Sequence, residues 1–302
     1  MSFHDVADVI EKLENAGYVT SREIATVVFL ASVTDKPILV EGPAGVGKTE
    51  LAKAISRALG LQLIRLQCYE GLDESKALYE WEYAKQLLYT QMVKEKIGDV
   101  IEGALTLKDA VEKIACHEDA FFSERFIQPR PLLQAITSDE RVVLLVDEVD
   151  KADPEFEAFL LELLSDYQVT IPELGTKTAR VIPYVLLTSN NYRDMSDALK
   201  RRCIHIYIDY PERDLEYRIV KLKLPEISDV LAARIVDAVR AIRELGLKKN
   251  PCISETIDWA RSLVALSVES LDAHVLADTL NMICKYRADA QLVKANVASV
   301  LK

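Results

Sequence analysis

A glycine-rich segment carries residue types that suit the binding of a nucleotide phosphate. Gly42 to Thr49 matches the pattern G-x-x-x-x-G-K-[ST] at every fixed position. Glycines let backbone N–H groups face a phosphate, the lysine reaches the β- and γ-phosphates, and the threonine hydroxyl ligates Mg²⁺. The candidate nucleotide-binding residues are Gly42, Pro43, Ala44, Gly45, Val46, Gly47, Lys48, Thr49 and Glu50, with Thr49 also a candidate metal ligand.

The flanks of this segment fit its expected surroundings. The apolar run 37–41 predicts a buried strand, and the apolar spacing of 51–59 predicts a helix that stops at Gly60. Strand, glycine-rich loop and helix in that order is the arrangement a phosphate-binding loop requires. Tyr18 and Val19, which precede it, are positional candidates for contact with an adenine ring.

A pair of acids ends another apolar run. Residues 142–146 predict a buried parallel strand that delivers Asp147 and Glu148 at its carboxyl end. Asp147 would hold Mg²⁺, and Glu148 would orient and deprotonate the attacking water. Residues 150–153 contain a K-x-D triplet of the kind that reads guanine, but Asp153-Pro154 looks like the start of a helix, so we expect ATP and not GTP.

Two further groups complete the set of candidate catalytic residues. Asn190 follows the apolar run 184–188 and could hold the water or the γ-phosphate, although a turn asparagine is the alternative. Arg201 and Arg202 precede the run 204–208. They are either a solvated helix end or cations that meet the nucleotide of a neighbouring subunit. Lys48 is the only obvious cation near the loop in the same chain.

The order of these elements predicts an α/β fold in two parts. Residues 1–210 are expected to form a core with a five-stranded parallel sheet, from the runs near 37, 63, 142, 184 and 204, flanked by helices. Residues 211–302 are expected to form an α-helical lid. Within the core, 84–120 is predicted to be helical and 168–182 to be a β-hairpin.

Charge and composition limit the partners. A net charge of -11 argues against a general nucleic-acid binder. No apolar run approaches the length of a membrane span and no signal-peptide pattern is present, so we expect a cytoplasmic protein. The aromatic segment Tyr79–Tyr83 is expected to be a helix with a half-buried aromatic face; the alternative is an exposed aromatic and acidic surface for a partner.

These motifs together resemble the AAA+ ATPases, and among them the MoxR branch. The resemblance covers nearly the whole chain and implies ATP and Mg²⁺ as ligands, with a ring, expected to be a hexamer. Arg202 matches the position of the arginine finger, with Arg201 as the alternative. The segments 84–120 and 168–182 look like the helical insert and hairpin of that branch.

The segments 66–73 and 78–81 look like the sub-branch that accompanies molybdenum-containing carbon monoxide dehydrogenases. That resemblance implies a protein with a von Willebrand factor A domain as partner and a metalloenzyme as client.

One feature departs from the family. Its lid helix often carries a sensor arginine in a Ser-Pro-Arg setting. The expected equivalent here is 254–256, where Thr256 has no charge, and Arg261 is a poor substitute.

Three functions follow as expectations. The leading one is Mg²⁺-dependent ATP hydrolysis that drives the remodelling of a client protein for metal-centre assembly. The second is a nucleic-acid-directed motor, which would need a basic stripe that the net charge disfavours. The third is a nucleotide-dependent scaffold with little turnover.

Overall fold

The chain is built around one parallel β-sheet. The computed structural model describes residues 2–92, 106, 123–172 and 174–301. Five strands lie in the order β2-β5-β8-β1-β9, and every neighbouring pair is parallel. The strands are β1 (Ile38–Glu41), β2 (Leu63–Gln67), β5 (Val143–Asp147), β8 (Tyr184–Ser189) and β9 (Ile204–Tyr207). All five predicted strands are therefore present, which confirms the α/β class.

The position of each strand follows from its sequence pattern. β1, β5 and β8 are buried at every residue, as expected for central parallel strands covered on both faces. β2 lies at an edge and alternates: Ile64 and Leu66 are buried while Arg65 and Gln67 are exposed. Since the strands are parallel, their carboxyl ends meet at one edge of the sheet.

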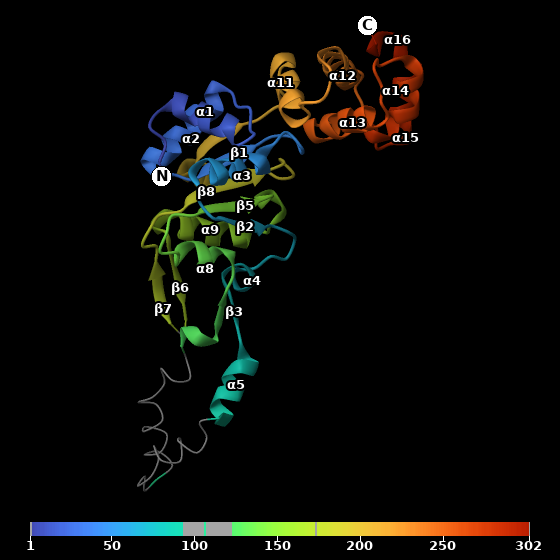
Figure 1. The fold of residues 1–302 in the computed structure, drawn as a ribbon. Coiled ribbons are helices and arrows are strands. Elements are labelled where there is room, and N and C mark those ends of the chain that lie inside the picture. Colours follow the sequence, from blue (N-terminus) through green and yellow to red (C-terminus); the bar gives the residue numbers. More distant parts are fainter. Residues whose placement is uncertain (1, 93–105, 107–122, 173, 302) are drawn as a thin grey trace.

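Helices cover both faces of the sheet (Figure 1). One layer of helices covers one face of the sheet, where its apolar residues pack with β1 and with alternate residues of β5. The second layer covers the other face, where it packs on β2, β5 and β8. The first layer contains α1 (Val6–Asn15), α2 (Arg22–Thr34) and α3 (Lys48–Leu59), and the second contains α4 (Glu74–Leu78), α8 (Pro131–Ile136) and α9 (Pro154–Asp166).

Two small antiparallel sheets, one of them a hairpin, project beyond the second layer (Figure 1). β6 (Gln168–Ile171) pairs antiparallel with β7 (Gly175–Thr178), as predicted for 168–182. The helix predicted at Tyr79–Tyr83 is wrong at its start, because β3 (Tyr79–Trp81) pairs with β4 (Ile127–Pro129). α5 (Tyr83–Met92) is helical, and the remainder of the predicted helical insert up to residue 120 lies outside the described residues. Short 3-10 turns occupy Glu124–Phe126, Val149–Lys151 and Leu280–Met282.

The C-terminal helical region has an apolar core of its own. The fully buried Trp259 lies in it and donates a hydrogen bond from Nε1 to Thr279 Oγ1 at 2.8 Å. Its helices are α11 (Arg213–Lys223), α12 (Asp229–Arg243), α13 (Ile253–Ala265), α14 (Ala273–Thr279), α15 (Arg287–Ala295) and α16 (Val297–Val300). Figure 1 shows this region beside the five-stranded sheet, on the side away from the two small sheets β3–β4 and β6–β7.

A buried ion pair ties three of these helices together. The side chain of Glu216 on α11 is fully buried, and both its oxygens accept bonds from Arg243 on α12, at 2.7 and 2.8 Å. The hydroxyl of Thr256 on α13 donates to the same carboxylate at 3.0 Å. All three polar groups are therefore paired away from water, which a buried charge requires.

Among the described residues, no helix combines the length and apolarity needed to cross a membrane.

Candidate functional site

The loop between β1 and α3 is confined by close neighbours. Gly42, Gly45 and Gly47 all adopt positive φ, which side chains other than glycine rarely accept. A Cβ on Gly42 would lie 2.0 Å from the carbonyl oxygen of Ile208. A Cβ on Gly45 would lie 2.3 Å from Cys252 Sγ, at the start of α13. The loop therefore needs glycine for its shape and for its contact with the helical region.

Lys48 is the buried cation of this loop. Its Nζ donates to the carbonyl oxygens of Gly42 and Pro43, both at 2.6 Å, and to Asn190 Oδ1 at 2.8 Å. Burial lowers the pKa of Lys48 to about 8, and the nearby carboxylates of Asp150, Asp147 and Glu148 oppose that shift. The ammonium group is held where a phosphate between the loop and Asn190 would meet it.

Asp147 ends β5 beside the hydroxyl of Thr49. Its Oδ1 accepts from Thr49 Oγ1 at 2.9 Å and from Thr188 Oγ1 at 2.6 Å, and the side chain is 3% exposed. A hydroxyl and a carboxylate side by side at the mouth of a phosphate loop fit Mg²⁺, which binds one or two protein oxygens together with phosphates and waters. Thr49 and Asp147 are thus brought together as predicted; Thr188 was hidden within an apolar run.

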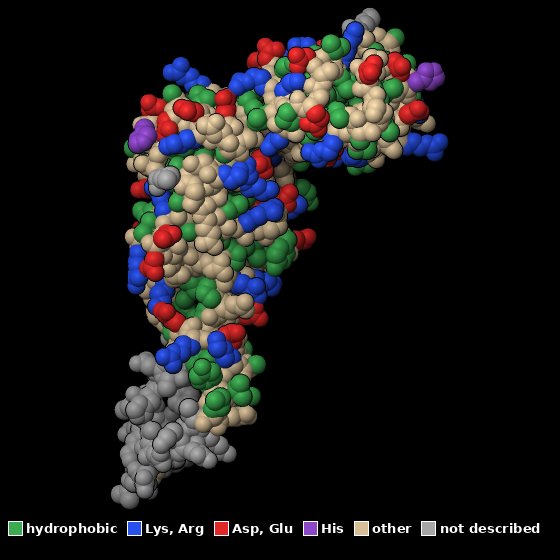
Figure 2. All heavy atoms as spheres, viewed as in Figure 1, with side chains coloured by type: hydrophobic (Ala, Val, Ile, Leu, Met, Phe, Trp, Pro, Cys, Tyr) green, Lys and Arg blue, Asp and Glu red, His purple; other side chains and the backbone are tan. Residues whose placement is uncertain are grey.

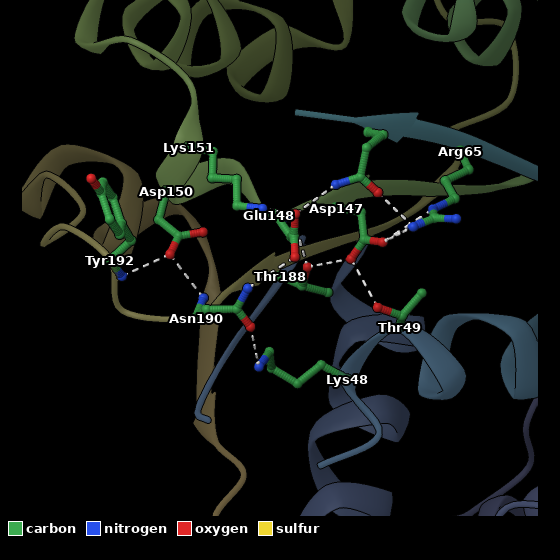
Figure 3. A network of polar contacts seen from close by, with 11 residues as sticks. Lys48, Thr49, Arg65, Asp147, Glu148, Asp150, Lys151, Thr188, Asn190 and Tyr192 are labelled. Carbon is green, nitrogen blue, oxygen red and sulfur yellow. Dashed lines mark hydrogen bonds and ion pairs between the residues drawn. The ribbon is translucent and has the colours of Figure 1, made fainter. Parts of the chain in front are cut away.

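Glu148 adopts a left-handed backbone, with φ 57° and ψ 49°. That conformation costs about 1–2 kcal/mol for a residue other than glycine and is typical of functional sites. Its carboxylate accepts three bonds, from Gln67 Nε2 at 2.9 Å, Lys151 Nζ at 2.6 Å and Asn190 Nδ2 at 3.1 Å. Figure 3 shows Lys151 and Asn190 reaching this carboxylate from two sides.

Asn190 lies between the lysine and the glutamate. Its amide oxygen accepts from Lys48 and its amide nitrogen donates to Glu148, so one side chain joins the two (Figure 3). Its backbone N–H donates to Asp150 Oδ2 at 2.9 Å, as does that of Tyr192 at 2.8 Å. Asp150 therefore braces the turn that carries Asn190.

Two further cations of the same chain contact the acids at the end of β5. Lys151 contacts Glu148, and Arg65 of β2 contacts Asp147 through Nε at 3.0 Å and Nη2 at 2.5 Å. Sequence reasoning missed Arg65 and Gln67 because alternating polar residues on an edge strand indicate a solvent-facing side.

A cavity of about 890 Å³ adjoins the loop, between the core and the helical region. Its volume is within the range of small-molecule sites. The structure places Tyr18 and Val19 on its wall, as proposed for the adenine-contacting positions. Apolar and aromatic residues among its lining are Tyr18, Val19, Ile208, Tyr210, Ile219 and Ile257.

The helical region presents Ser254, not Thr256, to this cavity. α13 begins at Ile253, so Ser254 is in its first turn and lines the cavity, whereas Thr256 is fully buried against Glu216. Thr256, the expected equivalent of the sensor arginine, therefore does not face the cavity. Arg261 is 63% exposed and lies 3.6 Å from Asp258, as expected for a poor substitute.

Arg201 and Arg202 end α10 (Asp197–Arg202) and are both exposed. Arg202 Nε donates to Ser165 Oγ at 2.5 Å. Within the described part of the chain, neither arginine lines the cavity or hydrogen-bonds to Lys48, Asn190 or Glu148.

Several known proteins are similar to this chain at low sequence identity. The gas vesicle ATPase GvpN1 of Halobacterium salinarum is 25% identical over 255 residues, covering 80% of this chain and 66% of its own length, which is less than two thirds. An uncharacterized protein of Staphylococcus haemolyticus is 27% identical over 240 residues, 77% of each chain. A solved structure, the Thermotoga maritima RuvB Holliday junction branch migration motor, aligns with 89% of this chain and 68% of its own at 15% identity and a TM-score of 0.46.

A family model matches residues 37–203, more than half of the chain and the whole stretch from β1 to the end of α10. Since these residues contain the phosphate loop, both acids and Asn190, the protein belongs to the AAA domain (dynein-related subfamily) family of ATPases.

Proposed function

We propose that this ATPase is a Mg²⁺-dependent chaperone of the MoxR type, which uses ATP hydrolysis to remodel a client protein. The observation that carries the proposal is the continuous polar chain from Lys48 through Asn190 to Glu148, with Asp147 and Thr49 beside it. It supplies a phosphate-binding cation, oxygen ligands for Mg²⁺ and a general base from one chain.

The roles follow from the geometry. Lys48 would contact the β- and γ-phosphates, and Thr49 with Asp147 would hold Mg²⁺, which would neutralise charge between those phosphates. Glu148 would accept the proton of the attacking water, and Asn190 would orient that water or the γ-phosphate. The loop Gly42–Thr49 would bind the nucleotide together with Glu50, which lines the cavity. Residues 1–210 would form the nucleotide-binding core and residues 211–302 the lid.

We also propose that the active form is a ring, a hexamer by resemblance. Arg202 would reach the nucleotide of the adjacent subunit, with Arg201 as the alternative. The exposure of both side chains at the end of α10 supports a role in a neighbour's site. The bond from Arg202 to Ser165 favours Arg202, because it holds that side chain at the end of α10.

We further propose that the client is a protein. The resemblance of residues 66–73 and 78–81 favours a metalloenzyme, with a von Willebrand factor A domain protein as partner. Figure 2 shows acidic and basic side chains side by side over the face in view, in place of a continuous basic surface, which supports a protein client over a nucleic acid.

Deleting the gene and assaying the candidate metalloenzyme tests this function. Normal amounts of apoenzyme with an incomplete metal centre would support it, since synthesis would be intact and assembly would not. A fully metallated, active enzyme in the deletion strain would contradict it. ATPase activity that DNA stimulates strongly and no protein does would favour the nucleic-acid motor, and binding with negligible turnover would favour the scaffold.

A further inference from the structure

Arg65 makes the strongest contact to the proposed metal ligand. Two of its guanidinium nitrogens, Nε and Nη2, donate to the same oxygen of Asp147, Oδ2, at 3.0 and 2.5 Å. The other oxygen of Asp147 already accepts from Thr49 and Thr188. Figure 3 shows Arg65 and Thr49 approaching Asp147 from different directions. Both carboxylate oxygens are therefore engaged, and among the described residues Arg65 is the only charged donor to them.

The burial of the two side chains is unequal. Asp147 is 3% exposed, whereas Arg65 is 46% exposed. A buried carboxylate needs a compensating charge, and a guanidinium with two donors on it satisfies that need. The exposed arginine can swing into solvent at little cost, but the carboxylate cannot.

Mg²⁺ would use the same negative charge. It binds oxygen ligands, carboxylates foremost, and a second cation within a few ångströms of that carboxylate opposes it by Coulomb repulsion. A cation that approaches Asp147 from the Thr49 side must share the carboxylate with Arg65 or displace it.

Arg65 also reaches the neighbouring acid through Gln67. Its Nη2 donates to Gln67 Oε1 at 2.5 Å, and this fixes the amide with Nε2 directed at Glu148, at 2.9 Å. The two exposed residues of β2 thus join both acids of β5 in one hydrogen-bonded chain.

We propose that Arg65 is a positioning residue whose guanidinium competes with Mg²⁺ for the carboxylate of Asp147 and so sets the free Mg²⁺ concentration at which Mg²⁺-nucleotide is held. This inference rests on the proposed Mg²⁺ site. It gives β2 a part in the site beyond its place at the edge of the sheet.

The test measures nucleotide binding, not turnover. Affinity for a fluorescent ADP analogue is determined at increasing free Mg²⁺, starting in EDTA, for the wild type, R65Q and R65K. We expect R65Q to shift the Mg²⁺ midpoint about tenfold lower, equivalent to about 1.4 kcal/mol, with affinity in EDTA within twofold of the wild type. R65K keeps the positive charge but offers a single ammonium group in place of two guanidinium nitrogens. Its Mg²⁺ midpoint should therefore lie between those of the wild type and R65Q.

R130Q is the matched control. Arg130, which follows β4, forms an exposed ion pair with Glu80 of β3. Its side chain is 43% exposed, close to the value for Arg65. Its loss removes the same charge from the chain without touching Asp147, so the midpoint should not move.

The outcomes separate the possible errors. A midpoint that R65Q leaves unchanged or raises would overturn the competition, as would an R65K midpoint at or below that of R65Q. A wild-type affinity that does not respond to Mg²⁺ would overturn the metal site itself. Unchanged affinity in EDTA shows that R65Q is folded, which the buried Ile64 and Leu66 of β2 favour.

Discussion

Raising the pH above 8 should weaken nucleotide binding through Lys48 alone. An ordinary lysine stays charged at pH 9, but burial lowers the pKa of Lys48 to about 8. A bound phosphate favours the ammonium form, so the pKa of Lys48 in the complex must be higher than in the free protein. Affinity is therefore full below pH 8 and is lost as the pH rises through 8.

The size of the effect follows from the pKa. With a value of about 8, about one tenth of the free protein carries the charge at pH 9, so the apparent Kd for ADP should be about tenfold higher than at pH 7. This is about 1.4 kcal/mol. Burial also raises the pKa of Tyr18 and of Cys252 beside the loop, so neither gains charge before Lys48 loses it.

Calorimetry at pH 7, 8 and 9 in two buffers of different ionisation enthalpy measures the affinity and the protons taken up together. At pH 8 we expect uptake of about half a proton per ADP, since half of the free lysines are neutral there. Lys48→Arg is the control, because its guanidinium stays charged in this range and should remove the pH dependence, even at lower affinity. A flat wild-type profile from pH 7 to 9 with no proton uptake would refute the reasoning.

Three further perturbations test other parts of the site. Glu148→Gln should bind ATP normally and hydrolyse it about 10²–10⁴-fold more slowly, because an amide cannot accept the proton of water; near-normal turnover would exclude that role. Arg202→Ala should bind ATP yet lose about 10³–10⁵ in rate, and mixing it with Lys48→Ala should restore activity at mixed interfaces; full activity in a strict monomer would contradict the ring. Arg243→Ala should lower the free energy of unfolding of the helical region by about 3–5 kcal/mol, because it strands a buried carboxylate. Thermal unfolding measures this loss, and Arg213→Ala, which breaks an exposed pair, should lower the stability far less.

The sheet was predictable because its strands are encoded locally. Central strands such as 142–146 are continuous apolar runs bounded by polar residues, and burial on both faces requires that pattern. The segment Tyr79–Trp81 was not predictable in this way. Its strand depends on pairing with Ile127–Pro129, nearly fifty residues later, and no local pattern reports such a partner.

The site was predictable only where a motif fixes the residue type. Lys48, Thr49, Asp147 and Glu148 follow from their places beside a glycine loop or at a strand end, and the structure brings them together with Asn190. Whether these residues perform their assigned roles stays a prediction.

The partners of these residues come from other strands, and sequence alone does not show them. Thr188 looks like one more residue of an apolar strand, and Arg65 like one solvent-facing residue of an edge strand. Only the sheet order, which places β5 between β2 and β8, puts both of them beside Asp147.

The close contact between Gly45 and Cys252 couples the shape of the phosphate loop to the position of the helical region. There is no room between them for a single Cβ, so a shift of the loop at Gly45 presses on the first turn of α13. Arg243 Nε also donates to the carbonyl of Pro251 at 2.8 Å, one residue before Cys252, while its other nitrogens hold Glu216 of α11. We therefore expect a change in the loop at Gly45 to be passed through these contacts to α13, α12 and α11 together.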